Sequence, residues 1–317
     1  MLIFNKLSLF FLSGMLLLGA CGWQKKVPEV SKMDDLPYPF EMKKIDIGDD
    51  IEIAYADLGG GKETLIFIHG LGSYAPAWKK NLEDLQKDYR CIAVDLPGYG
   101  KSSKGNYEGS MRFFANSIIR LMDKLNLKNA VLAGHSMGGQ IAITAALAYP
   151  ERVSKLILIA PAGLETFHKG EKQWFREVLT TDAVKLTTVE QIRSNIGWNF
   201  YRFPAEAEFM ISDRIAMRKC EDFNAYAYII PKCVEGMVDE PVFDHLADVK
   251  QPALVIFGKQ DNLIPNRFLN GGHTEKYARE GSEKMPNARL EMIDEAGHFV
   301  MFEKSEAVNR LVREFLN

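Results

Sequence analysis

The chain has 317 residues, of which 47% are hydrophobic and 26% are charged. These proportions are typical of a folded globular protein and allow one large domain or two smaller ones. The 39 basic and 42 acidic residues leave a formal net charge of −3. This balance excludes the strong basic field that nucleic-acid binding requires, so we expect no nucleic-acid partner. No histidine or cysteine cluster has metal-ligand spacing, so we expect no metal.

The first residues have the pattern of an export signal, which we assign to residues 1–20. Lys6 precedes an apolar run from Leu7 to Ala20, which is shorter than the about 20 residues that span a bilayer. The run ends in Leu18-Gly19-Ala20-Cys21, which resembles the cleavage motif of bacterial lipoproteins. That resemblance implies lipidation of Cys21 and attachment to the outer membrane or to the outer face of the cytoplasmic membrane. The alternatives are an ordinary secretory signal and an uncleaved anchor.

Residues 21–40 are polar and contain three prolines. We expect a lipidated tether there, which reaches at most roughly 60 Å when fully extended. Three further cysteines follow in the chain. Cys91 lies in a strand pattern and is expected to be a small buried hydrophobe. Export would permit a disulfide between Cys220 and Cys233, and their sequence positions leave that pairing open.

The next part of the chain alternates between strand and helix patterns. Two antiparallel strands are predicted on either side of Asp49-Asp50. Helical patterns, such as the one that Ser110 is expected to cap, separate short apolar runs typical of strands buried on both faces. These runs are 64–70, 90–98, 129–136, 153–163 and 252–258. The alternation predicts an α/β fold with a mostly parallel, doubly wound sheet.

The alternation is interrupted by a long, mostly helical and aromatic segment, and then resumes with a last strand and a terminal helix. We therefore divide the part of the chain that follows the tether into a core, 41–163 and 249–317, and a helical cap, 164–248. As a cap, the segment is expected to line an apolar pocket with its aromatic side chains, unless these pack onto the core instead. They are Trp174, Phe175, Trp198, Phe200, Tyr201, Phe203 and Phe209.

The stretch "AGHSMGGQ" places Ser136 between Gly134 and Gly138, directly after a buried strand and before a helix. Glycine in regular structure costs about 0.5–1 kcal/mol relative to alanine, so its presence here indicates a backbone bend that side chains would obstruct. Such a turn holds a serine hydroxyl exposed and strained above a helix N-terminus, which favours an oxyanion. The alternative is a glycine-rich turn with a solvated serine.

A serine hydroxyl needs a base, and the base needs an acid that orients it. His298, in "DEAGHFVMFE", follows the last predicted strand, and Asp261, in "FGKQDNLIP", follows the strand before it. The carboxyl ends of parallel strands share one edge of the sheet, so Ser136, Asp261 and His298 are expected to meet there. His273 is the rival base.

Other residues are given lesser roles. Asp239 and Asp244 are weaker candidates for the acid, whereas Asp95 and Asp294 are interpreted as structural. His135 adjoins Ser136 in the chain and is expected to point elsewhere.

A second motif, "HGLGS", follows the first long buried strand. Its glycines let the backbone approach a ligand, so the N–H groups of Leu71 and Met137 are expected to form an oxyanion hole. The alternative is a turn that merely ends the strand.

Six motifs together resemble those of the α/β-hydrolase family: "HGLGS", "DLPGYGKS", "GHSMGG", "LILIAPAG", "FGKQDNLIP" and "AGHFVMFE". The resemblance covers roughly residues 45–317 and implies an α/β-hydrolase fold with a helical cap. By matching motifs, Ser136 is the nucleophile, Asp261 the acid and His298 the base, with no cofactor. The order Ser–Asp–His is also that of the family.

The motif "GHSMGG" is shared by carboxylesterases and lipases, whereas haloalkane dehalogenases and epoxide hydrolases carry an aspartate at the position of Ser136. Carbon–carbon bond hydrolases usually show Gly-Pro-Gly after the HG motif, where this chain has "LGSYAPAW". The sequence thus favours acyl-enzyme hydrolysis of a small ester with apolar groups. The alternatives are a carbon–carbon bond hydrolase, a lipase and a non-catalytic, lipid-anchored ligand-binding protein. The oligomeric state stays open.

Overall fold

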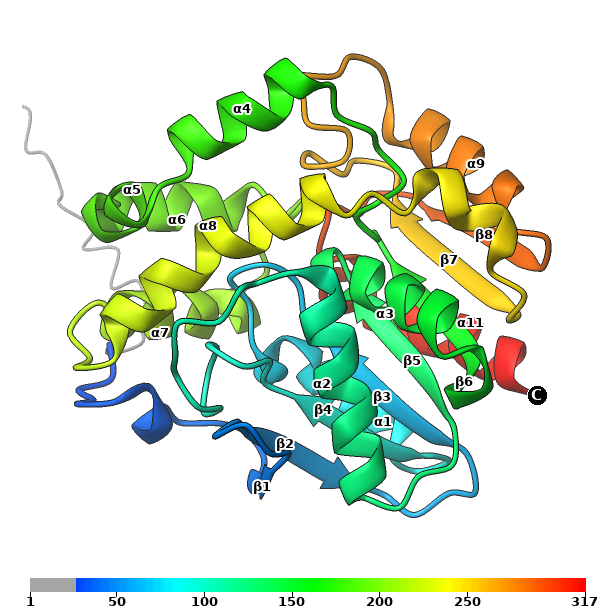
Figure 1. Cartoon of the computed structure of the whole chain (residues 1–317), viewed down its shortest axis with the longest axis horizontal. Helices are drawn as coiled ribbons and strands as arrows, with labels where there is room; N and C mark the ends of the chain where they lie inside the picture. The colour runs from blue at the N-terminus through cyan, green and yellow to red at the C-terminus, as the bar shows by residue number, and fades with distance from the viewer. Residues whose placement is uncertain (1–26) are drawn as a thin grey trace, which may run out of the picture.

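The computed structural model describes residues 27–317, so the predicted signal and Cys21 lie outside the described residues. An eight-stranded sheet forms its centre, in the order β1-β2-β4-β3-β5-β6-β7-β8 (Figure 1). The strands are β1 (Lys43–Asp46), β2 (Glu52–Leu58), β3 (Thr64–Ile68), β4 (Arg90–Val94), β5 (Ala130–His135), β6 (Val153–Ile159), β7 (Ala253–Gly258) and β8 (Ala288–Ile293). β1 and β2 pair antiparallel, and all pairs from β4 to β8 are parallel. The predicted mostly parallel α/β sheet is therefore confirmed.

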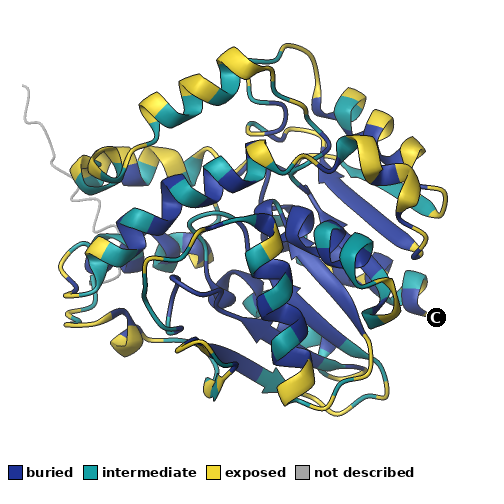
Figure 2. Cartoon of the chain, in the orientation of Figure 1, coloured by how far each residue is buried: buried dark blue, intermediate teal, exposed yellow. Residues whose placement is uncertain are grey.

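Helices pack on both faces of the sheet. Side chains alternate along a strand, so Ile66 and Ile68 of β3 join one core, with α2, α3 and α9, whereas Leu65 and Phe67 join the other, with α1, α10 and α11. Figure 2 shows the resulting burial of the central strands. These helices are α1 (Lys79–Leu85), α2 (Met111–Lys124), α3 (Met137–Ala148), α9 (Thr274–Lys284), α10 (Val300–Glu303) and α11 (Ser305–Leu316). As predicted, Ser110 caps α2: its Oγ accepts from the Phe113 N–H at 3.0 Å.

Between β6 and β7 the chain leaves the sheet and forms a helical insertion, which Figure 1 shows beyond the carboxyl ends of the strands. Its helices are α4 (Lys169–Val178), α5 (Thr181–Leu186), α6 (Val189–Gly197), α7 (Glu208–Met217) and α8 (Phe223–Asp239). α8 is the longest of these and packs against α2, α4 and α5. Through these contacts it joins the insertion to the core.

The tether prediction is wrong for the part of residues 21–40 that the structure describes, which begins at Val27. Met33 and Leu36 are fully buried, and the Glu221 N–H donates to the carbonyl of Ser31 at 2.9 Å. Tyr38 donates from its hydroxyl to Asp95 Oδ2 at 2.8 Å. The segment thus lies as a strap across the core and the helical insertion. Its polar average composition concealed the apolar side chains that hold it there.

The cysteine thiols of the described chain are free and buried, and this includes both members of the Cys220–Cys233 pair that the sequence left open. Burial raises the pKa of Cys91 and of Cys233 to about 12, and that of Cys220 to about 11. We expect the Cys21→Ser variant to show no thiol reactive toward Ellman's reagent at pH 8 when native, because the thiolate is the nucleophile. In denaturant it should show three. One reactive thiol in denaturant would instead indicate a Cys220–Cys233 disulfide.

Within residues 27–317, no helix combines the length and the apolar character needed to cross a membrane.

Candidate active site

The turn between β5 and α3 holds Ser136 in a backbone conformation that residues other than glycine rarely adopt. Its φ is 53° and its ψ is −118°; a positive φ of this kind is strained for a residue other than glycine. A Cβ at Gly134 would overlap the carbonyl oxygen of Gly138, and a Cβ at Gly138 would overlap that of Ile68. The two glycines are therefore required because the strand, the turn and the neighbouring strand approach one another this closely.

His298 and Asp261 lie in the loops after β8 and β7 and form a buried pair. His298 Nδ1 is 2.8 Å from Asp261 Oδ2, and the two residues are 3% and 8% exposed. The other carboxylate oxygen, Oδ1, accepts from the N–H groups of Leu263 at 2.8 Å and Ile264 at 3.1 Å. An ionised carboxylate only accepts, so His298 carries its proton on Nδ1, and Nε2 is left free to act as a base.

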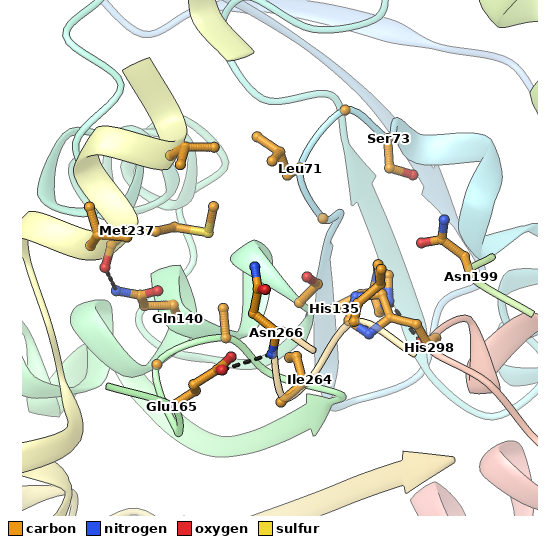
Figure 3. Close-up of a pocket in the computed structure, with 18 of the residues that line it drawn as sticks. Leu71, Ser73, His135, Gln140, Glu165, Asn199, Met237, Ile264, Asn266 and His298 are labelled. Atoms are coloured by element: carbon orange, nitrogen blue, oxygen red, sulfur yellow. Dashed lines mark hydrogen bonds between the residues drawn. The ribbon is translucent and has the colours of Figure 1, made fainter. Parts of the chain in front are cut away.

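Ser136 lines a cavity of about 610 Å³ together with His298 and Leu71. Figure 3 shows the last two among the side chains that line it. Among the residues that the structure describes, Ser136 Oγ has no hydrogen-bond partner. Hydrogen bonds between a catalytic serine and its base are often long in the absence of substrate. The structure thus brings the three predicted residues to one edge of the sheet, with the acid and the base already bonded.

The loop that carries Leu71 lies directly against the serine. A Cβ at Gly70 would be 3.1 Å from the Cβ of Ser136. The backbone N–H groups of Leu71 and Met137 donate no hydrogen bond to any residue of the described chain. Met137 is the first residue of α3, where helical N–H groups lack an internal partner. Both amides therefore remain available to an oxyanion.

A buried histidine fixes this loop. The Leu96 N–H donates to His69 Nε2 at 3.1 Å, so the ring proton lies on Nδ1, which donates to the carbonyl of Gly70 at 2.8 Å. Burial lowers the pKa of His69 and keeps the ring neutral. His69 is the first residue of the "HGLGS" motif, whose predicted role rested on its glycines and not on this side chain.

The expectation that His135 points away from the site is wrong. His135 lines the cavity, and its ring centroid is 4.8 Å from that of His298. Its Nε2–H donates to the backbone carbonyl of His298 at 3.0 Å, so it holds the segment that carries the base. Burial lowers the pKa of His135 well below 6.5, which keeps the ring neutral beside His298. The position of His135 next to Ser136 in the chain did not indicate this contact, because His298 lies 163 residues further along.

The remaining candidates lie outside the serine–histidine–aspartate group. His273 is the exposed residue at the N-cap position of α9 and does not line the cavity. Asp239 forms an ion pair with Arg176 at 2.6 Å. Asp95 is buried and accepts from the N–H of Ala75 at 2.7 Å, which is a structural role.

Asp294 is exposed and forms an ion pair with Lys259 at 2.8 Å. Asp244 lines the cavity, but the histidine base is bonded to Asp261 instead.

The predicted aromatic lining is mostly wrong. Of the seven aromatic residues, Phe175 lines the cavity, whereas Phe200 is buried in the core beside α10 and Trp198 is exposed. The apolar lining comes instead from both the insertion and the loop after β7, as Phe167, Phe175, Val234, Met237, Val238 and Ile264. Hydrophobicity alone did not distinguish the side chains that face the cavity from those that hold the insertion on the core.

The lowered pKa values of the buried histidines His69 and His135 should make stability depend on pH. Below about pH 6.5 the unfolded chain gains protons that the folded chain does not, so the free energy of unfolding should fall, by up to about 1.4 kcal/mol per pH unit for each histidine. In urea unfolding at pH 7 and pH 5, the His135→Gln variant should lose less stability than the wild type. His245→Gln, which changes an exposed imidazole, is the control. An equal loss in wild type and His135→Gln would contradict the neutral state of His135.

In the described range 27–317, no group of three or more His, Cys, Asp or Glu side chains is placed to hold a metal ion.

The chain belongs to the alpha/beta hydrolase fold family, whose model matches residues 63–305. It is 30% identical over 289 residues to the 2-hydroxy-6-oxononadienedioate/2-hydroxy-6-oxononatrienedioate hydrolase of Burkholderia vietnamiensis, covering 86% of this chain and 93% of that one. Among solved structures it resembles a probable hydrolytic enzyme of Pseudomonas aeruginosa PAO1, with a TM-score of 0.80, 24% identity, and 91% and 99% coverage. It also resembles a thermophilic esterase of Thermogutta terrifontis, with a TM-score of 0.70, 26% identity, and 87% and 98% coverage. The protein is thus a hydrolase of this family.

Proposed function

We propose that the protein is a serine hydrolase that cleaves carboxylic esters through an acyl-enzyme. The observation that supports this most directly is the buried pair of His298 and Asp261, 2.8 Å apart, beside a serine held at positive φ in the same cavity. The 26% identity to a structurally similar esterase agrees with it.

The proposed reaction proceeds in two halves. His298 Nε2 takes the proton from Ser136 Oγ as that oxygen attacks the ester carbonyl, and the N–H groups of Leu71 and Met137 stabilise the oxyanion. The imidazolium then protonates the leaving alcohol. Water, activated by the same imidazole, later releases the acyl group. Asp261 holds the imidazole in the required tautomer throughout.

Rapid mixing of the enzyme with 4-nitrophenyl butyrate tests this chemistry. An acyl-enzyme that accumulates should release a burst of nitrophenol close to one equivalent per enzyme, followed by a slower steady state. A fluorophosphonate reacts with the free nucleophile, forming an O–P bond and releasing fluoride, and mass spectrometry of the labelled enzyme should place the label on Ser136. Ester turnover with no label on any serine would contradict the proposal.

Carbon–carbon bond hydrolysis is the second candidate, because the Burkholderia relative named above is a 2-hydroxy-6-oxononadienedioate hydrolase and matches most of the chain. The two activities share a fold, and a comparison of steady-state kinetics on the two kinds of substrate distinguishes them. We expect kcat/KM for 4-nitrophenyl butyrate to exceed that for 2-hydroxy-6-oxononadienedioate. The opposite order would favour the second candidate.

Lipidation of Cys21 stays a prediction from the sequence alone. Phase separation of bacterial extracts in Triton X-114 tests it: the wild type should partition into detergent, and Cys21→Ser should lose that preference. Equal partitioning of the two would exclude lipidation at this position.

A further inference from the structure

One wall of the cavity carries three polar side chains beside apolar ones. Gln140 lies one turn into α3, Glu165 follows β6, and Asn266 follows β7. In Figure 3 the Glu165 carboxylate and the Asn266 side chain lie next to each other, on the same side of the cavity as Gln140. His135 and His298 lie on the opposite side. The apolar side chains around this wall, such as Val234 and Met237, offer it no donor.

The Glu165 carboxylate is held by two donors that leave one oxygen unused. Oε1 accepts from the N–H of Asn266 at 2.7 Å and from Nδ2 of Asn270 at 2.8 Å. Oε2 accepts no hydrogen bond from any residue in the described range. Burial raises the pKa of Glu165, and the two donors oppose that rise. The carboxylate is thus fixed in direction and has an acceptor to spare.

The amide of Gln140 is fixed in the same way. Its Nε2 donates to the carbonyl oxygens of Met237 at 2.9 Å and Glu240 at 3.0 Å, which uses both of its hydrogens. The orientation of the amide is therefore set, and Oε1 is left as an acceptor. In Figure 3 the nitrogen points toward Met237 and the oxygen points the other way, into the cavity. Gln140 as a whole is 1% exposed.

Two cations also line the cavity, but neither is bonded to this wall. Arg214 donates to the carbonyl of Gly72 and lies over the ring of Tyr226, 5.0 Å from its centroid, on the side of the oxyanion loop. Lys172, on α4, forms no ion pair with Glu165 or with any other described residue. The two spare acceptors thus line the cavity without a hydrogen-bond partner among the described residues.

We infer that Glu165 and Gln140 form a subsite for a hydrogen-bond donor, a hydroxyl or a protonated amine, carried on an otherwise apolar acyl or alcohol part of the ester. A polar site that hydrogen-bonds a substrate group rejects analogues lacking it, because its buried polar atoms are then unpaired. A carboxylate at the same position on the substrate is repelled. The inference rests on the proposed function, since it names the substrate class of that site.

Matched substrates test it. We would measure kcat/KM of the wild type for 4-nitrophenyl esters with acyl chains of four to eight carbons that end in methyl, hydroxyl, ammonium or carboxylate. Acetate esters of alcohols with the same end groups test the alcohol side. In at least one series, hydroxyl or ammonium should exceed methyl by about tenfold to a hundredfold at the best length, and carboxylate should be poorest.

Glu165→Gln is the decisive variant, because it removes the charge and keeps an oxygen for Asn266 and Asn270. It should lower kcat/KM for the ammonium-ended esters more than for the methyl-ended ones, and so lose most of the ammonium preference, and it should melt near the wild-type temperature. Glu177→Gln, which removes a carboxylate from the exposed face of α4, should keep the preference. No donor preference in either series, or a preference that Glu165→Gln leaves intact, overturns the inference.

A binding measurement separates the inference from the proposed function. If the wild type fails to turn over methyl-ended esters, that result counts against the proposed ester hydrolysis but not against the subsite. Calorimetry with hexylammonium, hexanol and hexanoate then still tests the subsite without turnover. Wild-type affinity should be highest for hexylammonium and lowest for hexanoate, and Glu165→Gln should lose that order. Equal affinities, or the reverse order, would overturn the inference.

Discussion

Replacing Ser136 with alanine should lower kcat for 4-nitrophenyl butyrate by at least about 10⁴-fold and abolish fluorophosphonate labelling. The oxyanion amides and the cavity remain in this variant, so the residual rate reports what binding and electrostatics supply without a nucleophile. Gly134 and Gly138, which allow the tight turn, are unchanged in this variant, so the fold should be retained. Steady-state kinetics, labelling and thermal melting measure these three quantities.

Ser194 offers a matched control, because it is an exposed serine on α6 within the helical insertion. Ser194→Ala should keep the rate and the labelling of the wild type. A Ser136→Ala protein that is folded and retains a tenth or more of the wild-type rate would rule out Ser136 as the nucleophile.

Replacing Asp261 with asparagine should lower kcat by about 10⁴-fold near neutral pH. Oδ1 already accepts from the backbone N–H groups of Leu263 and Ile264, so the asparagine oxygen takes that place and its NH₂ group faces His298. The imidazole must then accept at Nδ1 and carry its proton on Nε2, which no longer serves as a base toward Ser136. The measurement is kcat as a function of pH, with KM expected to change little.

Asp294→Asn is the control for this prediction, because it removes an exposed carboxylate that is paired with Lys259 at 2.8 Å and lies four residues before His298. It should leave kcat unchanged. An Asp261→Asn enzyme as active as the wild type at pH 7 would show that the 2.8 Å contact does not set the tautomer of His298. The site would then need another residue to orient the base.

Much of the fold and the main site residues could be predicted from local pattern. The apolar runs of β3 to β7 are buried on both faces, and burial of this kind requires a continuous apolar sequence that can be recognised without coordinates. The turn at Ser136 was equally predictable, since glycines two residues before and two after a serine that follows a buried strand indicate a backbone bend that side chains would obstruct. Asp261 and His298 followed because the carboxyl ends of parallel strands share one edge.

Two features could not be predicted from the sequence, because each depends on contacts between residues that are far apart in the chain. The bond from His135 to the His298 carbonyl joins two loops, and residues 27–40 pack on the body because Met33 and Leu36 find a buried place there.

The sequence by itself determined the parallel sheet, the strained serine and the edge where the acid and base gather, because these follow from periodicity and local backbone geometry. Tertiary structure alone decided that a neutral His135 lies beside the base and that residues 27–40 pack on the body of the protein. It also decided that Glu165 and Gln140 each keep an unused acceptor. The physical reason is that hydrogen-bond satisfaction and burial are properties of a side chain's full surroundings, and most of those surroundings come from elsewhere in the chain.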